Sequence, residues 1–258
     1  MAISSLISHS NSSDTSLYAY AALFISVLAI YNFDHLLDAL MTSEDAKTFR
    51  HHFYQQHFIL LIFWQLILLL VGVFIILYLP VKIFLAGVAM ICLMVIYFWL
   101  IFKSLKNNLI YRELFVAFGY TLAVALAPVF SEKATINAHF FHMLVIVYLI
   151  VLTNLYVFSI YEMDIDMEEN RHSIARSIKK PQMLNLSRAL IMISFGVIAG
   201  YTLLYGVWML GVTLVAVQLI YWLILEKQHV FAKNELYRLI GEFILILPGI
   251  ALLAHAKL

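Results

Sequence analysis

Long uncharged stretches of apolar residues recur along the chain, separated by short segments that hold most of its charges. A helix that crosses a membrane needs about 20 apolar residues, and runs of this length without period-2 alternation leave helices as the spanning elements. Five runs each predict one such helix: Thr15 to Phe33, Phe58 to Val81, Ile83 to Phe102, Leu114 to Ser131 and Ala134 to Tyr161.

The C-terminal part of the chain predicts three further spans. The uncharged run Ala189 to Leu225 would extend for about 55 Å as one helix, nearly twice the thickness of a bilayer core. We therefore expect two helices there, with a turn near Tyr205 to Gly206. The last span, Leu236 to Ala256, contains Pro248 and begins with charged residues.

These runs predict an all-α integral membrane protein, a helical bundle with eight transmembrane helices. We expect a single polytopic domain over residues 1–258. Two groups of four spans, 15–131 and 134–256, are possible halves of an internal duplication, because each group opens with a helix that ends in acidic residues.

Composition supports the membrane assignment. Hydrophobic residues make up 64% of the chain and charged residues 12%, and the mean hydropathy is +0.94, which lies outside the range of soluble domains. The formal net charge is only +1, so no nucleic-acid partner is expected. Membrane lipid is the partner that this composition predicts.

The basic residues divide unequally between the two sides of the membrane. Lys82, Lys133 and Lys257 fall on one side, and the other thirteen of the sixteen Lys and Arg residues fall on the opposite side. The positive-inside rule makes that richer side cytoplasmic. We expect an integral protein of a bacterial cytoplasmic membrane with both chain ends outside.

Two pairs of acidic residues, each pair spaced by four, lie where an apolar run ends: Asp34 and Asp38 in YNFDHLLD, and Glu162 and Asp166 in YEMDID. The negative end of the helix dipole and the neighbouring carboxylate both oppose such acids, so a positive group must balance each pair. The number of spans between the pairs places both on the cytoplasmic side. Paired carboxylates supply the hard oxygen ligands that Mg²⁺ prefers, and we favour a shared metal site over solvated interface acids.

Helical spacing aligns further residues with the acids. Val27 and Tyr31 lie above the first pair, and Asn154 and Phe158 lie above the second, so both stripes are predicted to line one cavity. An amide inside an apolar span is costly unless it has a partner. Asn154 therefore either bonds a neighbouring helix or reaches the cavity.

Basic residues flank the acids on the same side. The two acid pairs, if they face each other, could hold a diphosphate through metal ions. Positive-inside bias explains most of the basic residues, but one or two in each loop are expected to neutralise this diphosphate as it leaves. The candidates are Lys106, Arg112, Arg171 and Arg176.

On these residues the chain resembles the UbiA superfamily of intramembrane prenyltransferases, which have helical spans, an NxxxDxxxD motif at the end of the second helix and a DxxxD motif at the end of the sixth. The resemblance implies that Asp34 and Asp38 correspond to the first motif, and Glu162 and Asp166 to the second. It implies that these four carboxylates are catalytic and hold Mg²⁺ ions that bind a prenyl diphosphate.

Three departures from the family pattern accompany this resemblance. Asn32, a candidate for substrate binding, stands two residues before Asp34 instead of four, and Glu162 replaces an aspartate. The family's first helix is expected to be absent or reduced to residues 1–14.

The expected function is Mg²⁺-dependent transfer of a prenyl group from a prenyl diphosphate to a lipophilic, and by preference aromatic, acceptor within the membrane. One alternative is a catalytically silent UbiA-like protein that binds lipid or scaffolds a complex. Another is a cation-coupled transporter, although transporter sites lie near the bilayer midplane and these acids lie at its boundary.

The predicted orientation can be tested by labelling single cysteines with an impermeant thiol reagent. Cysteines at Ser43 and Ser173 should be protected, because both positions are expected in the cytoplasm, whereas those at Ser131 and Lys257 should react. The reverse pattern would place the acids on the opposite face.

Overall fold

A computed structural model describes residues 2–10, 15–41, 49–103, 110–131, 136–168 and 178–250. Within these ranges the chain forms helices and no strand, which confirms the all-α prediction. Contacts divide the chain into two compact units. The smaller unit is Thr15–Ala86, and the larger unit combines Met1–Asp14 with Gly87–Leu258. The predicted halves, 15–131 and 134–256, do not coincide with these units, and the internal duplication stays a prediction.

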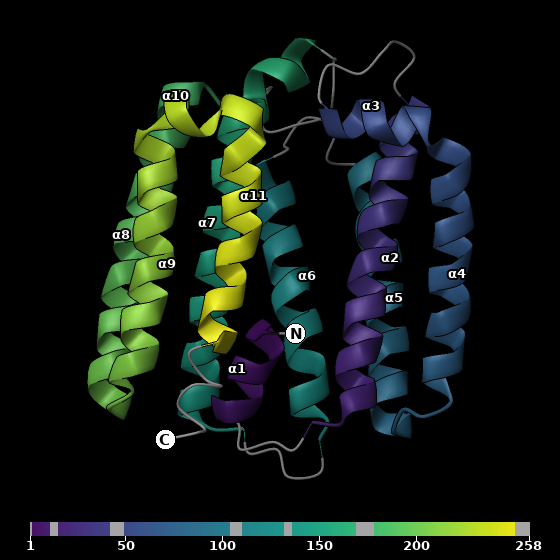
Figure 1. The fold of residues 1–258 in the computed structure, drawn as a ribbon. Coiled ribbons are helices and arrows are strands. Elements are labelled where there is room, and N and C mark those ends of the chain that lie inside the picture. Colours follow the sequence, from purple (N-terminus) through teal and green to yellow (C-terminus); the bar gives the residue numbers. More distant parts are fainter. Residues whose placement is uncertain are drawn as a thin grey trace. The chain divides into compact units, whose positions relative to one another are not determined.

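The smaller unit contains α2 (Leu17–Met41), α3 (Phe49–Gln56), α4 (Phe58–Ile76) and the first residues of α5 (Val81–Lys103). Helices α2 and α4 pack side by side, and α3 contacts both of them (Figure 1). The sequence did not predict α3, because its residues FRHHFYQQ lie between apolar runs.

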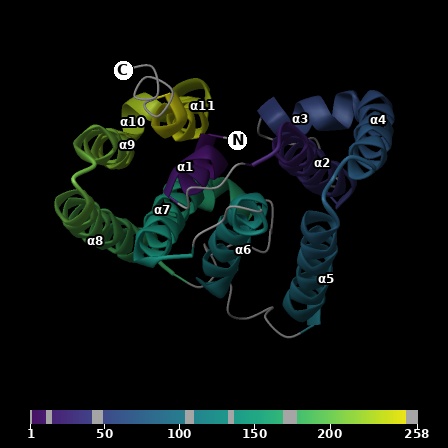
Figure 2. The same cartoon turned by 90° about the horizontal axis from the view of Figure 1, so that it is seen from below.

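The larger unit is built around α7. It contains α1 (Ala2–Ser10), α6 (Ile110–Val129), α7 (Ala138–Glu168), α8 (Lys180–Tyr205), α9 (Trp208–Glu226), α10 (Gln228–Phe231), α11 (Leu236–Phe243) and the 3-10 turns Lys233–Glu235 and Ile244–Ile246. Helix α7 packs against α1, α6, α8, α9 and α11. Figure 2, a view along the helices, shows α1, α6 and α8 beside it. Helix α7 is the most buried of the span-length helices and forms the core of this unit.

Five helices in the described parts of the chain are long and apolar enough to cross a membrane: Leu17–Leu37, Phe58–Ile76, Ala138–Ile165, Lys180–Tyr205 and Trp208–Glu226. Helix α4 leaves most of its apolar side chains exposed, with Ile59 84% exposed. An apolar surface of this kind suits lipid and not water. The fold therefore indicates a helical membrane protein, and the count of eight spans stays a prediction.

The long C-terminal apolar run folds into two helices at the predicted place. Helix α8 ends at Tyr205, and Gly206 has φ +68°, a left-handed conformation that glycine adopts without a steric penalty. Helix α9 then begins at Trp208. The predicted turn near Tyr205 to Gly206 is confirmed.

Both ends of this C-terminal part differ from the predicted bounds. Helix α8 begins at Lys180 and not at Ala189, because Pro181 fits the first helical turn, where its missing N–H is not needed. After α11 the helix tightens into the 3-10 turn Ile244–Ile246 just before Pro248, which cannot donate to the carbonyl of Ile244. The predicted span to Ala256 extends beyond the described residues.

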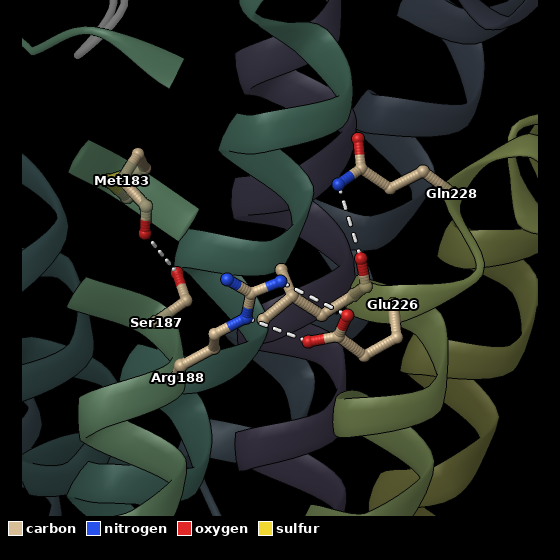
Figure 3. A network of polar contacts seen from close by, with 6 residues as sticks. Met183, Ser187, Arg188, Glu226 and Gln228 are labelled. Atoms are coloured by element: carbon tan, nitrogen blue, oxygen red, sulfur yellow. Dashed lines mark hydrogen bonds and ion pairs between the residues drawn. The ribbon is translucent and has the colours of Figure 1, made fainter. Parts of the chain in front are cut away.

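Charged side chains join the helices at one end of the larger unit. Arg188 on α8 donates from Nε and Nη2 to the two carboxylate oxygens of Glu226 on α9, at 2.7 and 3.1 Å (Figure 3). At the other end, His139 Nε2 on α7 lies 2.6 Å from the Tyr201 hydroxyl on α8. Helices α7, α8 and α9 therefore run antiparallel, each to the next. The Arg188–Glu226 ion pair lies at one end of them, and the His139–Tyr201 contact lies at the other.

The α8–α9 hairpin packs closely where Gly211 meets Thr202. A Cβ at residue 211 would lie 2.7 Å from Thr202 Cγ2, whereas one at Gly196 on α8 would meet no atom within 4 Å. We predict that Gly211→Ala lowers the free energy of unfolding in detergent micelles by about 1–3 kcal/mol, because the helices must separate. Gly196→Ala is the matched control and should leave it unchanged or raise it by up to about 1 kcal/mol. Equal effects of the two substitutions would contradict the close packing.

Candidate functional site

The first acidic pair lies in the last turns of α2, as predicted. Asp34 is exposed, and the side chain of Asp38 lies outside the described residues although its backbone continues the helix. Asn32 is buried, and its Nδ2 donates to the carbonyl of Leu61 at 3.2 Å and to Gln65 Oε1 at 2.9 Å. Its amide therefore joins α2 to α4 and so positions the helix that carries Asp34.

The second acidic pair lies in the last turns of α7. Glu162 is 25% exposed, and its Oε1 accepts hydrogen bonds from Arg238 Nη2 and, at 3.2 Å, from the Tyr237 hydroxyl. The Asp166 side chain lies outside the described residues. The positive group that the sequence requires beside these acids is present at Glu162, and it is a guanidinium from α11.

Aromatic rings surround the contact between Glu162 and Arg238. The guanidinium carbon of Arg238 lies 5.5 Å from the centre of the Phe158 ring, within the range of a cation–π interaction. Tyr237 stacks on Tyr161 with ring centres 4.2 Å apart, and the Tyr161 hydroxyl donates to the carbonyl of Ile224 at 2.5 Å. The Arg238 side chain, which lies over the Phe158 ring, is only 12% exposed.

A hydrogen-bonded triangle lies deeper between the same helices. Asn154 Nδ2 donates to the Tyr221 hydroxyl at 2.8 Å and to the carbonyl of Gly241 at 3.1 Å, and the Tyr221 hydroxyl donates to that carbonyl at 2.9 Å. A Cβ on residue 241 would lie 2.6 Å from Phe158 Cε1, so glycine allows α11 to approach α7 this closely. Of the two roles left open for Asn154, the structure shows the bond to neighbouring helices.

The stripe formed by Asn154, Phe158 and Glu162 faces α11 along its whole length. These three residues each contact a residue of α11, and the cavity that the sequence predicts beside them stays a prediction. The reason is electrostatic, because a buried amide and a half-buried carboxylate both need donors or acceptors that apolar neighbours cannot supply.

The predicted basic residues are placed only in part. Arg112 lies in the first turn of α6, but its side chain is not among the described ones, and Lys106, Arg171 and Arg176 lie outside the described ranges. Asp164 and Lys180 form an exposed ion pair with a distance of 2.7 Å at the same end of the unit as Glu162. Among the side chains that the structure describes, no three of His, Cys, Asp and Glu gather into a metal-binding group.

Sequence reasoning missed Tyr237, Arg238, Tyr221 and Gly241 as parts of this site. Arg238 carried a signal, because an arginine at the start of an apolar span requires an anionic partner on the same side of the membrane, and Glu162 is on that side. The two tyrosines and the glycine carried none, since such residues are common in membrane helices.

The fold and its apolar surface define a helical integral membrane protein. Comparison of the chain with models of protein families, with curated proteins and with solved structures finds no match.

The triangle predicts that Asn154 and Tyr221 act as one unit. Asn154→Leu and Tyr221→Phe should each lower the free energy of unfolding by about 1 kcal/mol, and the effect of the double variant should fall short of the sum by about 0.6 kcal/mol. Thr153→Val is the control, because the buried Thr153 hydroxyl bonds only the Leu149 carbonyl of its own helix. The effects of Thr153→Val and Tyr221→Phe on the free energy of unfolding should add. If the effects of Asn154→Leu and Tyr221→Phe add as well, Asn154 and Tyr221 are not coupled.

Proposed function

We propose that the chain is a membrane prenyltransferase of the UbiA type, with eight spans and its acidic motifs on the cytoplasmic side. The observation that carries this proposal is the state of Glu162. Its carboxylate is held half-buried in the last turns of the central helix, beside a guanidinium and at the charged end of the unit. An acid that served only as a polar boundary residue would be solvated, whereas a partly desolvated acid is typical of a functional site.

The donor set fits Mg²⁺ by its chemistry. Asp34 is an exposed carboxylate, and both donors to Glu162 reach Oε1, so that Oε2 has no partner among the described residues. We propose that Asp34, Asp38, Glu162 and Asp166 hold the ion, since hard carboxylate oxygens are its preferred protein ligands. Bound Mg²⁺ would neutralise charge on the diphosphate of the prenyl substrate.

The chain's own side chains and helices account for the rest of the proposed reaction. Lys106, Arg112, Arg171 and Arg176 bind oxygens of the diphosphate as the electron pair of the allylic C–O bond moves onto it. The apolar helices exclude water, so the allylic cation is attacked by the lipophilic or aromatic acceptor, which loses a proton as the new bond forms. Asn32 and Asn154 act through helix packing, by positioning α2 and α7.

One observation favours a second candidate function. Arg238 already neutralises Glu162, as it would in a UbiA-like protein that has lost catalysis and binds lipid or scaffolds a complex. The two candidates differ in one measurable product, because only an enzyme releases diphosphate when magnesium, a prenyl diphosphate and an acceptor are all supplied.

We predict that Asp38→Asn and Asp166→Asn each abolish magnesium-dependent release of diphosphate from a panel of prenyl diphosphates in intact membranes. Each change keeps the size of the side chain but removes the charge of a ligand, so excess magnesium should restore little activity. Glu162→Asp should retain more activity than Glu162→Gln, since it keeps a carboxylate.

Asp164→Asn is the matched control for these substitutions. It removes a charge from the same turns of α7, but from the exposed pair with Lys180, and should retain wild-type activity. Diphosphate release that is unaffected by Asp38→Asn and Asp166→Asn would refute the proposed site. A wild type that releases no diphosphate with any substrate pair would favour the silent protein.

A further inference from the structure

Arg238 uses only a small part of its hydrogen-bonding capacity in the structure. A guanidinium has five N–H donors, and Nη2 donates to Glu162 Oε1. Its Nε is buried and has no hydrogen-bond partner among the described residues. A buried donor without a partner is costly, so this atom needs a functional explanation.

The position of Arg238 is fixed from several sides. It is the third residue of α11, which follows a turn where Asn234 and Glu235 have φ +52° and +54°, and its guanidinium lies over the Phe158 ring. The side chain therefore holds its planar donor fork in place without using most of it. A planar fork of this kind matches the spacing of phosphate oxygens and can bind two of them at once.

Glu162 is the group that Arg238 and a metal ion would share. The guanidinium takes Oε1 of Glu162, and the same carboxylate is one of the four proposed ligands. If Glu162 turned toward the ion, Arg238, which is only 12% exposed beside Glu162, would lose its anionic partner. A cation in so dry a position needs a new anion nearby.

We propose that Arg238 binds an oxygen of the substrate's diphosphate. In this proposal Arg238 pairs with Glu162 only until the ion and the diphosphate bind together. This inference rests on the proposed function and adds a residue from α11 to its site. Its consequence is reciprocal coupling. Diphosphate should strengthen the binding of the ion, and the ion should strengthen the binding of diphosphate, because each relieves the charge that the other leaves unbalanced.

The rival explanation is that Arg238 only fastens α11 to α7. In that case its replacement would destabilise the fold but leave the coupling between ion and diphosphate intact, so a binding measurement separates the two roles where a stability measurement would not.

The test uses the full chain in lipid nanodiscs. Mn²⁺ binding is followed by electron paramagnetic resonance with and without inorganic diphosphate, and each titration is corrected by an identical one with empty nanodiscs. In the wild type, diphosphate should strengthen Mn²⁺ binding by about 5–150-fold, the usual range of coupling between sites. In Arg238→Gln this factor should fall well below the wild-type value, to the part that direct contact between ion and diphosphate supplies, while Mn²⁺ alone binds at least as tightly, because Glu162 is released.

Two further variants complete the experiment. Arg188→Gln removes a guanidinium from the ion pair with Glu226 at the same end of the unit and should keep the wild-type coupling. Arg238→Lys keeps the charge that pairs with Glu162 but lacks Nε and the planar fork, so it should remain folded and lose most of the coupling. It serves as the decisive variant if Arg238→Gln does not fold.

The outcomes are distinguishable. If the Arg238 variants keep the wild-type coupling, the proposed role of Arg238 is wrong. The same holds if the wild type binds both ligands without coupling. Neither result contradicts the proposed function. A wild type that binds neither Mn²⁺ nor diphosphate overturns both the role of Arg238 and the proposed function.

Discussion

A carboxylate and a guanidinium that are both shielded from water must neutralise one another. Glu162 on α7 and Arg238 on α11 are such a pair, so the fold must bring these two helices together at this contact. Removing one member of a buried ion pair costs about 3–5 kcal/mol, because the other charge is left without a partner. The pair therefore specifies where α11 lies on α7 more than it adds net stability. The aromatic rings and the Asn154 triangle then follow the same line of contact between the two helices.

The sequence predicts the coarse architecture well, because apolar runs report directly on helices in a membrane. It also predicts the turn at Gly206, where the length of the run requires a reversal and a glycine can adopt the left-handed conformation. Helix ends are predicted less well. A search for apolar runs cannot predict polar first turns such as that of α8, or short polar helices such as α3.

The candidate site shows the same division. The acids and their place at the ends of α2 and α7 are readable from spacing and the helix dipole. The partner of Glu162 is not, because it comes from residues far along the chain, and tertiary packing decides which basic residue reaches it. For Asn32 and Asn154 the sequence shows that a buried amide needs a partner, and only the structure shows that each partner is on a neighbouring helix.

The proposed function requires the two acidic pairs to form one site, although Asp34 and Glu162 lie in different compact units. Two metal ions that share a diphosphate lie only a few ångströms apart, so the carboxyl groups of the two pairs must come within about 15 Å of each other. The most direct measurement places nitroxide labels at Asp38→Cys and Asp166→Cys in a chain whose Cys92 is replaced by serine. A shared site predicts strong dipolar broadening of the spectrum, which only labels lying close together produce. A doubly labelled spectrum equal to the sum of the two singly labelled ones would contradict it.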